Sequence, residues 1–229
     1  MSGLTAKQMV YEARILFESI ASNDAPGFTD REWSVLLTNA QNKIVYEIYK
    51  LGFDKDEESR GIISSLLEPL TISDFTEAEL PNSFKVTLPR DCMYITMDRC
   101  YLKNNVPVRL ITMHQEAYFT NIDNPFLKPS KQKFWKIVND DSRLIITDGS
   151  VPVQYKGQYI KRPHPIIVSD LPVDKGIESI DGQEVIVQSD CKLHPNVHRR
   201  IVEVAAKLAY AATLNPEGYQ IQSIESQRI

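Results

Sequence analysis

The sequence predicts an α+β protein with an N-terminal three-helix layer, a central, mainly antiparallel β-sheet region with proline-rich loops, and a C-terminal helix followed by an extended tail. Two changes of hydrophobic period support this prediction. Apolar residues recur every three or four positions up to about residue 80, alternate with polar residues from about residue 82, and return to helical spacing after residue 190. The expected segments are 1–80, 81–190, 191–215 and 216–229, together forming one compact domain.

Three helices are predicted before residue 80, and the clearest runs from Thr29 to Leu51. Thr29 and Glu32 form a capping-box pattern, in which each side chain accepts a hydrogen bond from the other residue's backbone N–H. Residues 5–21 and 62–70 repeat the same apolar spacing, so we expect a compact helical layer. The expected core face of the central helix is Trp33, Leu36, Leu37, Ala40, Ile44, Ile48 and Leu51.

Short β-prone runs follow, separated by Asn, Asp, Pro and Gly. One hairpin is expected to turn at residues 139–142 and another near Asp181 and Gly182, because Asn, Asp and Ser side chains bond their own backbone and Gly tolerates turn dihedrals. The predicted strands are Phe84–Leu88, Tyr94–Met97, Val106–Met113, Phe134–Val138 and Leu144–Thr147.

Two proline-bearing loops interrupt the strands, at residues 124–129 and 162–165. Proline fixes φ and lacks an N–H, so such segments run extended at sheet edges or on the surface. Extended, preorganised loops suit protein docking.

The last predicted helix starts near Pro195 and ends at Asn215-Pro216. Its apolar residues again recur at helical spacing. The polar tail from Glu217 to Ile229 is expected to fray alone, although its apolar residues could order against a partner.

Composition excludes several classes of function. The chain has 229 residues and a net charge of −4, so it has no general attraction for nucleic-acid phosphates. No signal peptide or membrane-spanning run is evident, so we expect a protein that is made in a cytosol and leaves it only as part of a larger particle. The 3 cysteines lack a CxxC spacing and are expected to be reduced.

No catalytic or cofactor motif stands out. Phosphate-loop and nucleophile-elbow patterns are absent, and no cofactor is expected. His194 and His198 have the i, i+4 spacing of helical metal ligands, but Pro195 puts His194 at or before the helix start and no third ligand is evident. An enzyme with a dispersed site would have to draw on His114, Cys92 and His198.

Several segments, taken in order, resemble one known group. They are FTDREWSVLLTNAQNKIVYEIY, the strand end LPRD, NPFLKP, YIKRPHPIIV and SDCKLHPNVHRRIVEVAAKLAYA. This arrangement is similar to the ring and adaptor proteins that form the head-to-tail connector and tail barrel of crAss-like podoviruses, which are tailed phages of gut bacteria. The resemblance spans about residues 10 to 215.

The resemblance implies a virion component, not an enzyme: a homo-oligomeric ring, a dodecamer matched to the portal, that links portal and tail and lines the conduit for DNA ejection. Its partners would be copies of itself, the portal and adjacent ring or tail proteins, with DNA only as passing cargo and no membrane. The expected contact residues are Asn124, Pro125, Phe126, Leu127, Pro129, Arg162, Pro163, Tyr219, Ile221 and Ile224.

Two alternatives remain open at this stage. Each expected contact residue could instead shape its own loop or fill the subunit's core. The whole protein could be an assembly adaptor or chaperone that does not enter the virion, or a small enzyme with a dispersed active site.

Overall fold

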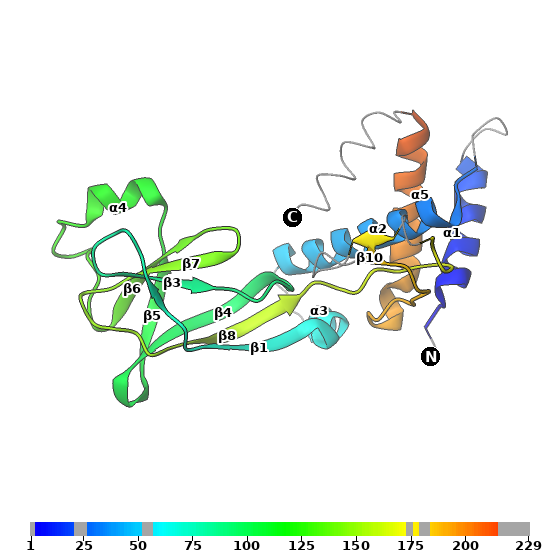
Figure 1. Ribbon diagram of the computed structural model, residues 1–229. Coiled ribbons are helices and arrows are strands. Elements are labelled where there is room, and N and C mark those ends of the chain that lie inside the picture. The colour runs from blue at the N-terminus through cyan, green and yellow to red at the C-terminus, as the bar shows by residue number, and fades with distance from the viewer. Residues whose placement is uncertain (1–2, 21–26, 52–56, 173–175, 179–183, 215–229) are drawn as a thin grey trace. The chain divides into compact units, whose positions relative to one another are not determined.

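The computed structural model describes residues 3–20, 27–51, 57–172, 176–178 and 184–214. The chain divides into two units, each described here by itself (Figure 1). Unit 1 combines Met1–Leu66 with Arg162–Ile229, and unit 2 is the continuous segment Leu67–Lys161. The expected segments 1–80, 81–190, 191–215 and 216–229 and their single compact domain stay predictions.

Unit 1 contains three long helices, α1 (Ala6–Ile20), α2 (Asp30–Leu51) and α5 (His198–Leu214). Helix α5 packs against both α1 and α2 (Figure 1). The predicted capping box is present, because the Thr29 N–H donates to the Glu32 carboxylate at 2.7 Å and the Glu32 N–H donates to the Thr29 hydroxyl at 3.3 Å. The predicted core face of α2 is buried except at its last residue, Leu51, which is 77% exposed.

The third predicted helix is shorter than expected. Helix α3 spans Glu57–Ile63, a 3₁₀ turn follows at Ser64–Leu66, and Leu67–Ile72 forms strand β1. The prediction of a helix through residue 70 was therefore wrong after Ile63. Strand β1 pairs antiparallel with β8 (Gln154–Lys161), a partner 83 to 93 residues away, and this pairing overrides a local apolar spacing that also fits a helix.

Unit 1 also contains a small two-stranded element, which comes before α5 in the sequence. Strands β9 (Ile177–Glu178) and β10 (Glu184–Val185) pair antiparallel, as the predicted hairpin requires. The turn of that hairpin, residues 179–183, lies outside the described residues. Ile177 packs with Ile167 and Leu171 in a small apolar cluster.

Unit 2 is an eight-stranded sheet with the order β1-β8-β4-β5-β6-β7-β3-β2. Every neighbouring pair is antiparallel except β5 and β6, which are parallel and are joined by a connection that contains helix α4 (Gln115–Asn121). The remaining strands are β2 (Thr76–Glu77), β3 (Ser83–Thr87), β4 (Cys92–Leu102), β5 (Val106–Thr112), β6 (Lys133–Val138) and β7 (Ser142–Ile146).

The prediction of a mainly antiparallel sheet is confirmed, and so is the hairpin whose turn joins β6 to β7. The Asn139 N–H donates to the Ser142 carbonyl at 3.1 Å across that turn. All five predicted strands are present, with β4 longer than expected. Strands β1, β2 and β8 and helix α4 were not predicted.

The sheet curls around its own core. One apolar cluster takes side chains from seven strands, which is possible only if the sheet bends so that distant strands face one another. Its buried members are Leu70, Val86, Leu88, Cys100, Val108, Phe134, Ile145, Tyr155 and Tyr159. Helix α4 covers part of the other face, where Tyr118 packs on Trp135, Ile137 and Ile146.

Candidate assembly surfaces

The connection from α4 to β6 contains half of the expected contact residues, and its backbone is held in place by many hydrogen bonds. The Asn124 side chain accepts the Phe126 N–H at 3.0 Å, and the Asn124 carbonyl accepts the N–H groups of Leu127 at 3.1 Å and Lys128 at 2.9 Å. These bonds form a local turn of the kind that Asn and Pro favour.

Two side chains of β6 donate hydrogen bonds to the backbone of the same loop. The Lys133 ammonium donates to the Phe126 carbonyl at 2.8 Å, and the Trp135 indole N–H donates to the Leu127 carbonyl at 3.1 Å. Trp135 is itself buried, 1% exposed, against Tyr118 of α4. The loop is therefore ordered before any partner binds, which lowers the entropy lost on binding.

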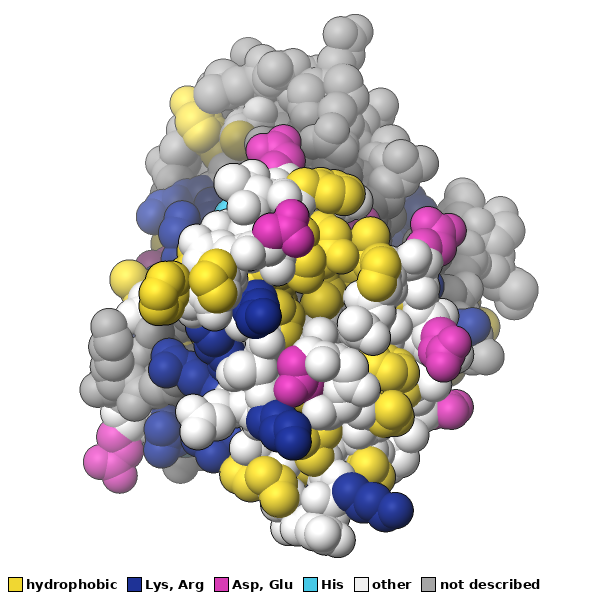
Figure 2. Space-filling model, turned by 90° about the vertical axis from the view of Figure 1, so that its left-hand side faces the viewer, with side chains coloured by type: hydrophobic (Ala, Val, Ile, Leu, Met, Phe, Trp, Pro, Cys, Tyr) yellow, Lys and Arg dark blue, Asp and Glu magenta, His cyan; other side chains and the backbone are white. Residues whose placement is uncertain are grey.

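Apolar side chains point outward from this ordered segment. Phe126 is 85% exposed, Phe119 on α4 is 67% exposed, and Leu127 is 45% exposed. We name Phe119, Pro125, Phe126 and Leu127 the α4–β6 surface. Figure 2 looks onto this end of unit 2 and shows hydrophobic patches separated by Lys and Arg side chains.

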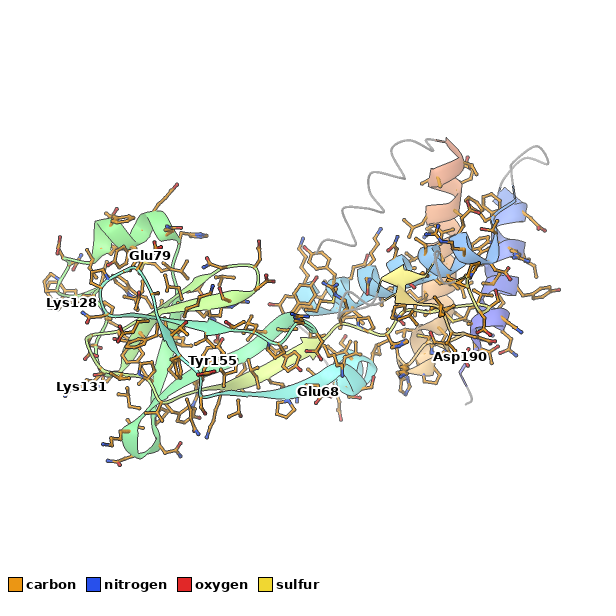
Figure 3. All side chains as sticks on the ribbon, in the orientation of Figure 1. Glu68, Glu79, Lys128, Lys131, Tyr155 and Asp190 are labelled. Carbon is orange, nitrogen blue, oxygen red and sulfur yellow. The ribbon has the colours of Figure 1, made fainter. Side chains whose placement is uncertain are left out.

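Not every expected contact residue of this loop is available. Pro129 is buried, so it shapes the loop from inside. Lys128 and Lys131 are exposed beside it and lie at the same end of unit 2 (Figure 3). Sequence reasoning did not single out these two lysines or Phe119.

The residues of the second proline loop, 162–165, are buried or half-buried. In unit 1, Pro163 is buried and Arg162 is half-buried. The residues that follow, 165–168, are also buried, and three polar side chains of α2 bind the backbone of residues 164–168.

Those three side chains form a buried polar stripe on α2. The Gln41 amide donates to the His164 carbonyl at 3.0 Å, the Thr38 hydroxyl accepts the Ile166 N–H at 3.1 Å, and the Ser34 hydroxyl accepts the Val168 N–H at 3.1 Å. Their spacing of four and three residues places them on one helix face. The stripe satisfies an extended segment that would otherwise bury unpaired backbone groups.

The last expected contacts, Tyr219, Ile221 and Ile224, lie outside the described residues.

His194 and His198 both form hydrogen bonds in the structure. His198 Nδ1 accepts the Leu4 N–H at 3.0 Å, so Nε2 carries the proton and donates to the Leu193 carbonyl at 3.0 Å. His194 accepts the Asn196 N–H at 3.4 Å at the start of the helix. Within the described ranges, no three His, Cys, Asp or Glu side chains are grouped as metal ligands would be.

The three residues considered for a dispersed active site have separate positions. His114 precedes α4 and Cys92 begins β4, both in unit 2, whereas His198 belongs to unit 1. Burial raises the pKa of the Cys92 thiol to about 11, and it likewise raises the pKa of Cys191 to about 11 and that of Cys100 to about 12. These thiols stay protonated near neutral pH, where nucleophilic chemistry needs a thiolate.

One polar network in unit 2 was not predicted. The Asp98 carboxylate accepts hydrogen bonds from the Lys136 ammonium and the Tyr155 hydroxyl, each at 2.6 Å, inside the curled sheet. Burial, together with the neighbouring Asp98 charge and hydrogen bond, raises the pKa of Tyr155 strongly. The three residues come from β4, β6 and β8, so no local sequence pattern could bring them together.

Among the helices in the described residues, none has both the length and the apolar character needed to cross a bilayer.

Comparison with known proteins gives two kinds of match. The family model described as "Phage tail ring protein 3/4" matches residues 4–218. The chain is 30% identical over 223 residues to "Ring protein 4/5" of Bacteroides phage crAss001, covering 88% of this chain and 90% of the relative. It is 32% identical over 196 residues to "Ring protein 3" of the same phage, covering 78% and 83%.

The matched region includes most of both units, so the resemblance suggested by helix and loop patterns is confirmed by matches that span them. The chain belongs to the phage tail ring protein 3/4 family of crAss-like phages.

Proposed function

We propose that this chain forms a homo-oligomeric ring in the head-to-tail connector or tail of a podovirus, made in the host cytoplasm and carried in the virion. A dodecamer that links portal and tail and surrounds the path of the ejected DNA is the form we favour. The observation that carries the proposal is the family match over residues 4–218. The role is mechanical, with no catalytic step.

The α4–β6 surface supports this proposal physically. Phe126 is almost fully exposed on a loop that the Lys133 and Trp135 side chains already hold in place. Exposed aromatic side chains on ordered loops are typical of the residues that contribute most to protein interfaces. We propose that this surface contacts an adjacent ring or tail protein, together with Asn124.

The remaining expected contact residues fall into two groups, proposed contacts and residues that shape their own segments. Arg162 and the tail residues Tyr219, Ile221 and Ile224 stay as proposed contacts. Pro129 and Pro163 are buried, so we propose that they act by shaping their segments.

Ring closure would make modest contacts sufficient. A contact between two different surfaces of one chain, repeated by rotation, closes into a ring when the rotation divides a full turn. The last contact to form is intramolecular and gains effective concentration, so individually weak contacts hold.

The first experiment places Phe126→Ala in the phage genome. Burying a Phe side chain contributes about 1.5–3 kcal/mol, so its loss weakens each contact by about tenfold to a hundredfold. Mass spectrometry of purified virions should show less of this protein than in wild type. Val138→Ala, at a residue that is 52% exposed on β6, is the matched control and should leave the amount unchanged.

The same measurement on wild-type virions separates the alternatives. A protein that is present in infected cells but missing from purified virions would be an assembly factor, and the ring proposal would fail. Negative-stain images of portal incubated with the purified chain should show an added layer. Deleting residues 217–229 should leave the fold intact and reduce incorporation; if the deletion unfolds the chain, the tail belongs to the core.

A further inference from the structure

Four basic residues lie side by side across four neighbouring strands of unit 2. Lys156 on β8 is in register with Arg99 on β4, Arg99 with Arg109 on β5, and Arg109 with Lys133 on β6. Residues in register project from the same face of a sheet. We name these four residues the basic row.

The basic row lies on the outer face of the curled sheet. Side chains alternate between the two faces along a strand, and each basic residue has a sequence neighbour in the enclosed core. Those neighbours are Tyr155, Cys100, Val108 and Phe134. Arg99 and Arg109 at the centre of the row are exposed.

This arrangement has an electrostatic cost in the isolated chain. Like charges directly opposite on neighbouring strands are destabilising. In the part of the chain that the structure describes, the ion pairs within 4.0 Å involve other residues. Lys156 lies over the Tyr101 ring at 4.9 Å and Lys133 donates to a backbone carbonyl, but neither contact supplies negative charge.

On the inner face of the same sheet, by contrast, a cation has a carboxylate partner. Lys136, three residues after Lys133 on the same strand, has Asp98 at 2.6 Å. The outer cations have no equivalent, so their charge is available to an anionic partner.

A surface of matching charge lies at the far edge of the same sheet. Strand β2 is an edge strand with both residues exposed, and Asp74, Glu77 and Glu79 are exposed along it and beside it. We name these three residues the acidic edge. Strands β7 and β3 lie between it and the basic row, so the two surfaces are separate features of one unit.

We propose that the basic row of one copy binds the acidic edge of the next copy in the ring. This inference rests on the proposed function and names its lateral contact. Two different, oppositely charged surfaces on one chain are what a head-to-tail contact requires. DNA is the competing anion, but uncompensated cations along a conduit would hold a passing duplex by its phosphates, so a protein interface is the favoured place for them.

The test uses two charge-reversed forms of the full chain. The first carries Arg99→Glu and Arg109→Glu, which removes the net positive charge of the row and leaves the acidic edge unchanged. The second carries Glu77→Lys and Glu79→Lys, so that both of its surfaces are basic. Each form alone should self-associate at least about tenfold more weakly than wild type in sedimentation equilibrium at low salt.

Mixing the two forms in equal amounts should restore association. In the mixture the wild-type row of the second form meets the wild-type edge of the first. A control with Arg199→Glu and Lys207→Glu, two exposed cations on α5, changes the net charge equally and should associate as wild type does.

Three results would overturn the inference: wild type that stays monomeric at about 1 mM protein in low salt, reversal that leaves association unchanged, or a mixture that does not recover. Binding to a fluorescent duplex oligonucleotide that is lost with Arg99→Glu and Arg109→Glu, while self-association persists, would assign the row to DNA. These failures leave the proposed function standing, because that function is tested separately by the presence of the chain in virions.

Discussion

Breaking the buried charge pair of unit 2 should destabilise that unit by about 3–5 kcal/mol. The side chains of Asp98 and Lys136 are 11% and 12% exposed, and the carboxylate also accepts the Tyr155 hydroxyl at 2.6 Å. Lys136→Met leaves the Asp98 carboxylate buried with a neutral donor only, and Asp98→Leu leaves the Lys136 ammonium without a counter-charge. Each single change therefore exposes the full cost of burying the other charge.

The double variant should lose less stability than the two single variants lose when their losses are added. With both charges removed no unpaired ion remains, so Asp98→Leu with Lys136→Met should lose at least about 2 kcal/mol less than the two single losses added together. The matched control is Lys161→Met, since Lys161 lies 3.7 Å from Asp91 and is 43% exposed, and it should change stability by less than about 1 kcal/mol.

The two tryptophans make the assay specific to one unit. Trp33 belongs to unit 1 and Trp135 to unit 2, so a Trp33→Phe background leaves Trp135, which is 1% exposed, as the fluorescent reporter of unit 2. Urea unfolding followed by this fluorescence gives the free energy of unfolding for each variant. Single variants within about 1 kcal/mol of the background, or losses that simply add, would refute the reasoning.

Three further predictions follow from packing and burial. Gly157→Ala should destabilise unit 2 by about 3 kcal/mol in the same assay, because its Cβ would overlap the Met97 carbonyl oxygen, whereas Gly61→Ala meets no atom and should stabilise α3 by about 0.5–1 kcal/mol. Thr38→Val should cost about 1–3 kcal/mol in thermal unfolding, since it leaves the buried N–H that its hydroxyl accepts without a partner. Iodoacetamide should modify Cys92 at pH 8 roughly a hundredfold more slowly than the same thiol in urea-unfolded chain, because burial raises its pKa from 9.0 to about 11; equal rates would contradict this.

Much of the fold was predictable because it depends on local patterns. The Thr29 and Glu32 capping box, the buried face of α2 and the hairpin turn at residues 139–142 depend on residues close in sequence. Period and turn chemistry report such features directly.

Other elements depend on distant partners. The sequence of strand β1 has the apolar spacing of a helix end, and its strand structure depends on its pairing with β8. Strand β8 itself has few apolar residues. Strand β8 is a strand because it lies between β1 and β4, with Tyr155 and Ile160 buried. Sequence spacing contains no information about that pairing.

The candidate surfaces, too, depend partly on local sequence and partly on residues that are distant in the sequence. Pro163 and Phe126 both belong to proline loops that looked extended and exposed, yet one is buried and the other is 85% exposed. The difference comes from the Ser34, Thr38 and Gln41 side chains on α2, which bind the backbone that follows Pro163. The basic row appears only when the register of four strands is known.

The face shown in Figure 2 fits the proposed ring, whose copies must stay separate until they assemble. Large continuous apolar patches favour premature association, whereas apolar side chains separated by cations, as in Figure 2, do not. A few surface ion pairs at about 0.2–1 kcal/mol each give weak, roughly millimolar binding between two copies. Closure of the ring then supplies the stability that a single contact lacks, so assembly should depend steeply on protein concentration and on a template that gathers the copies.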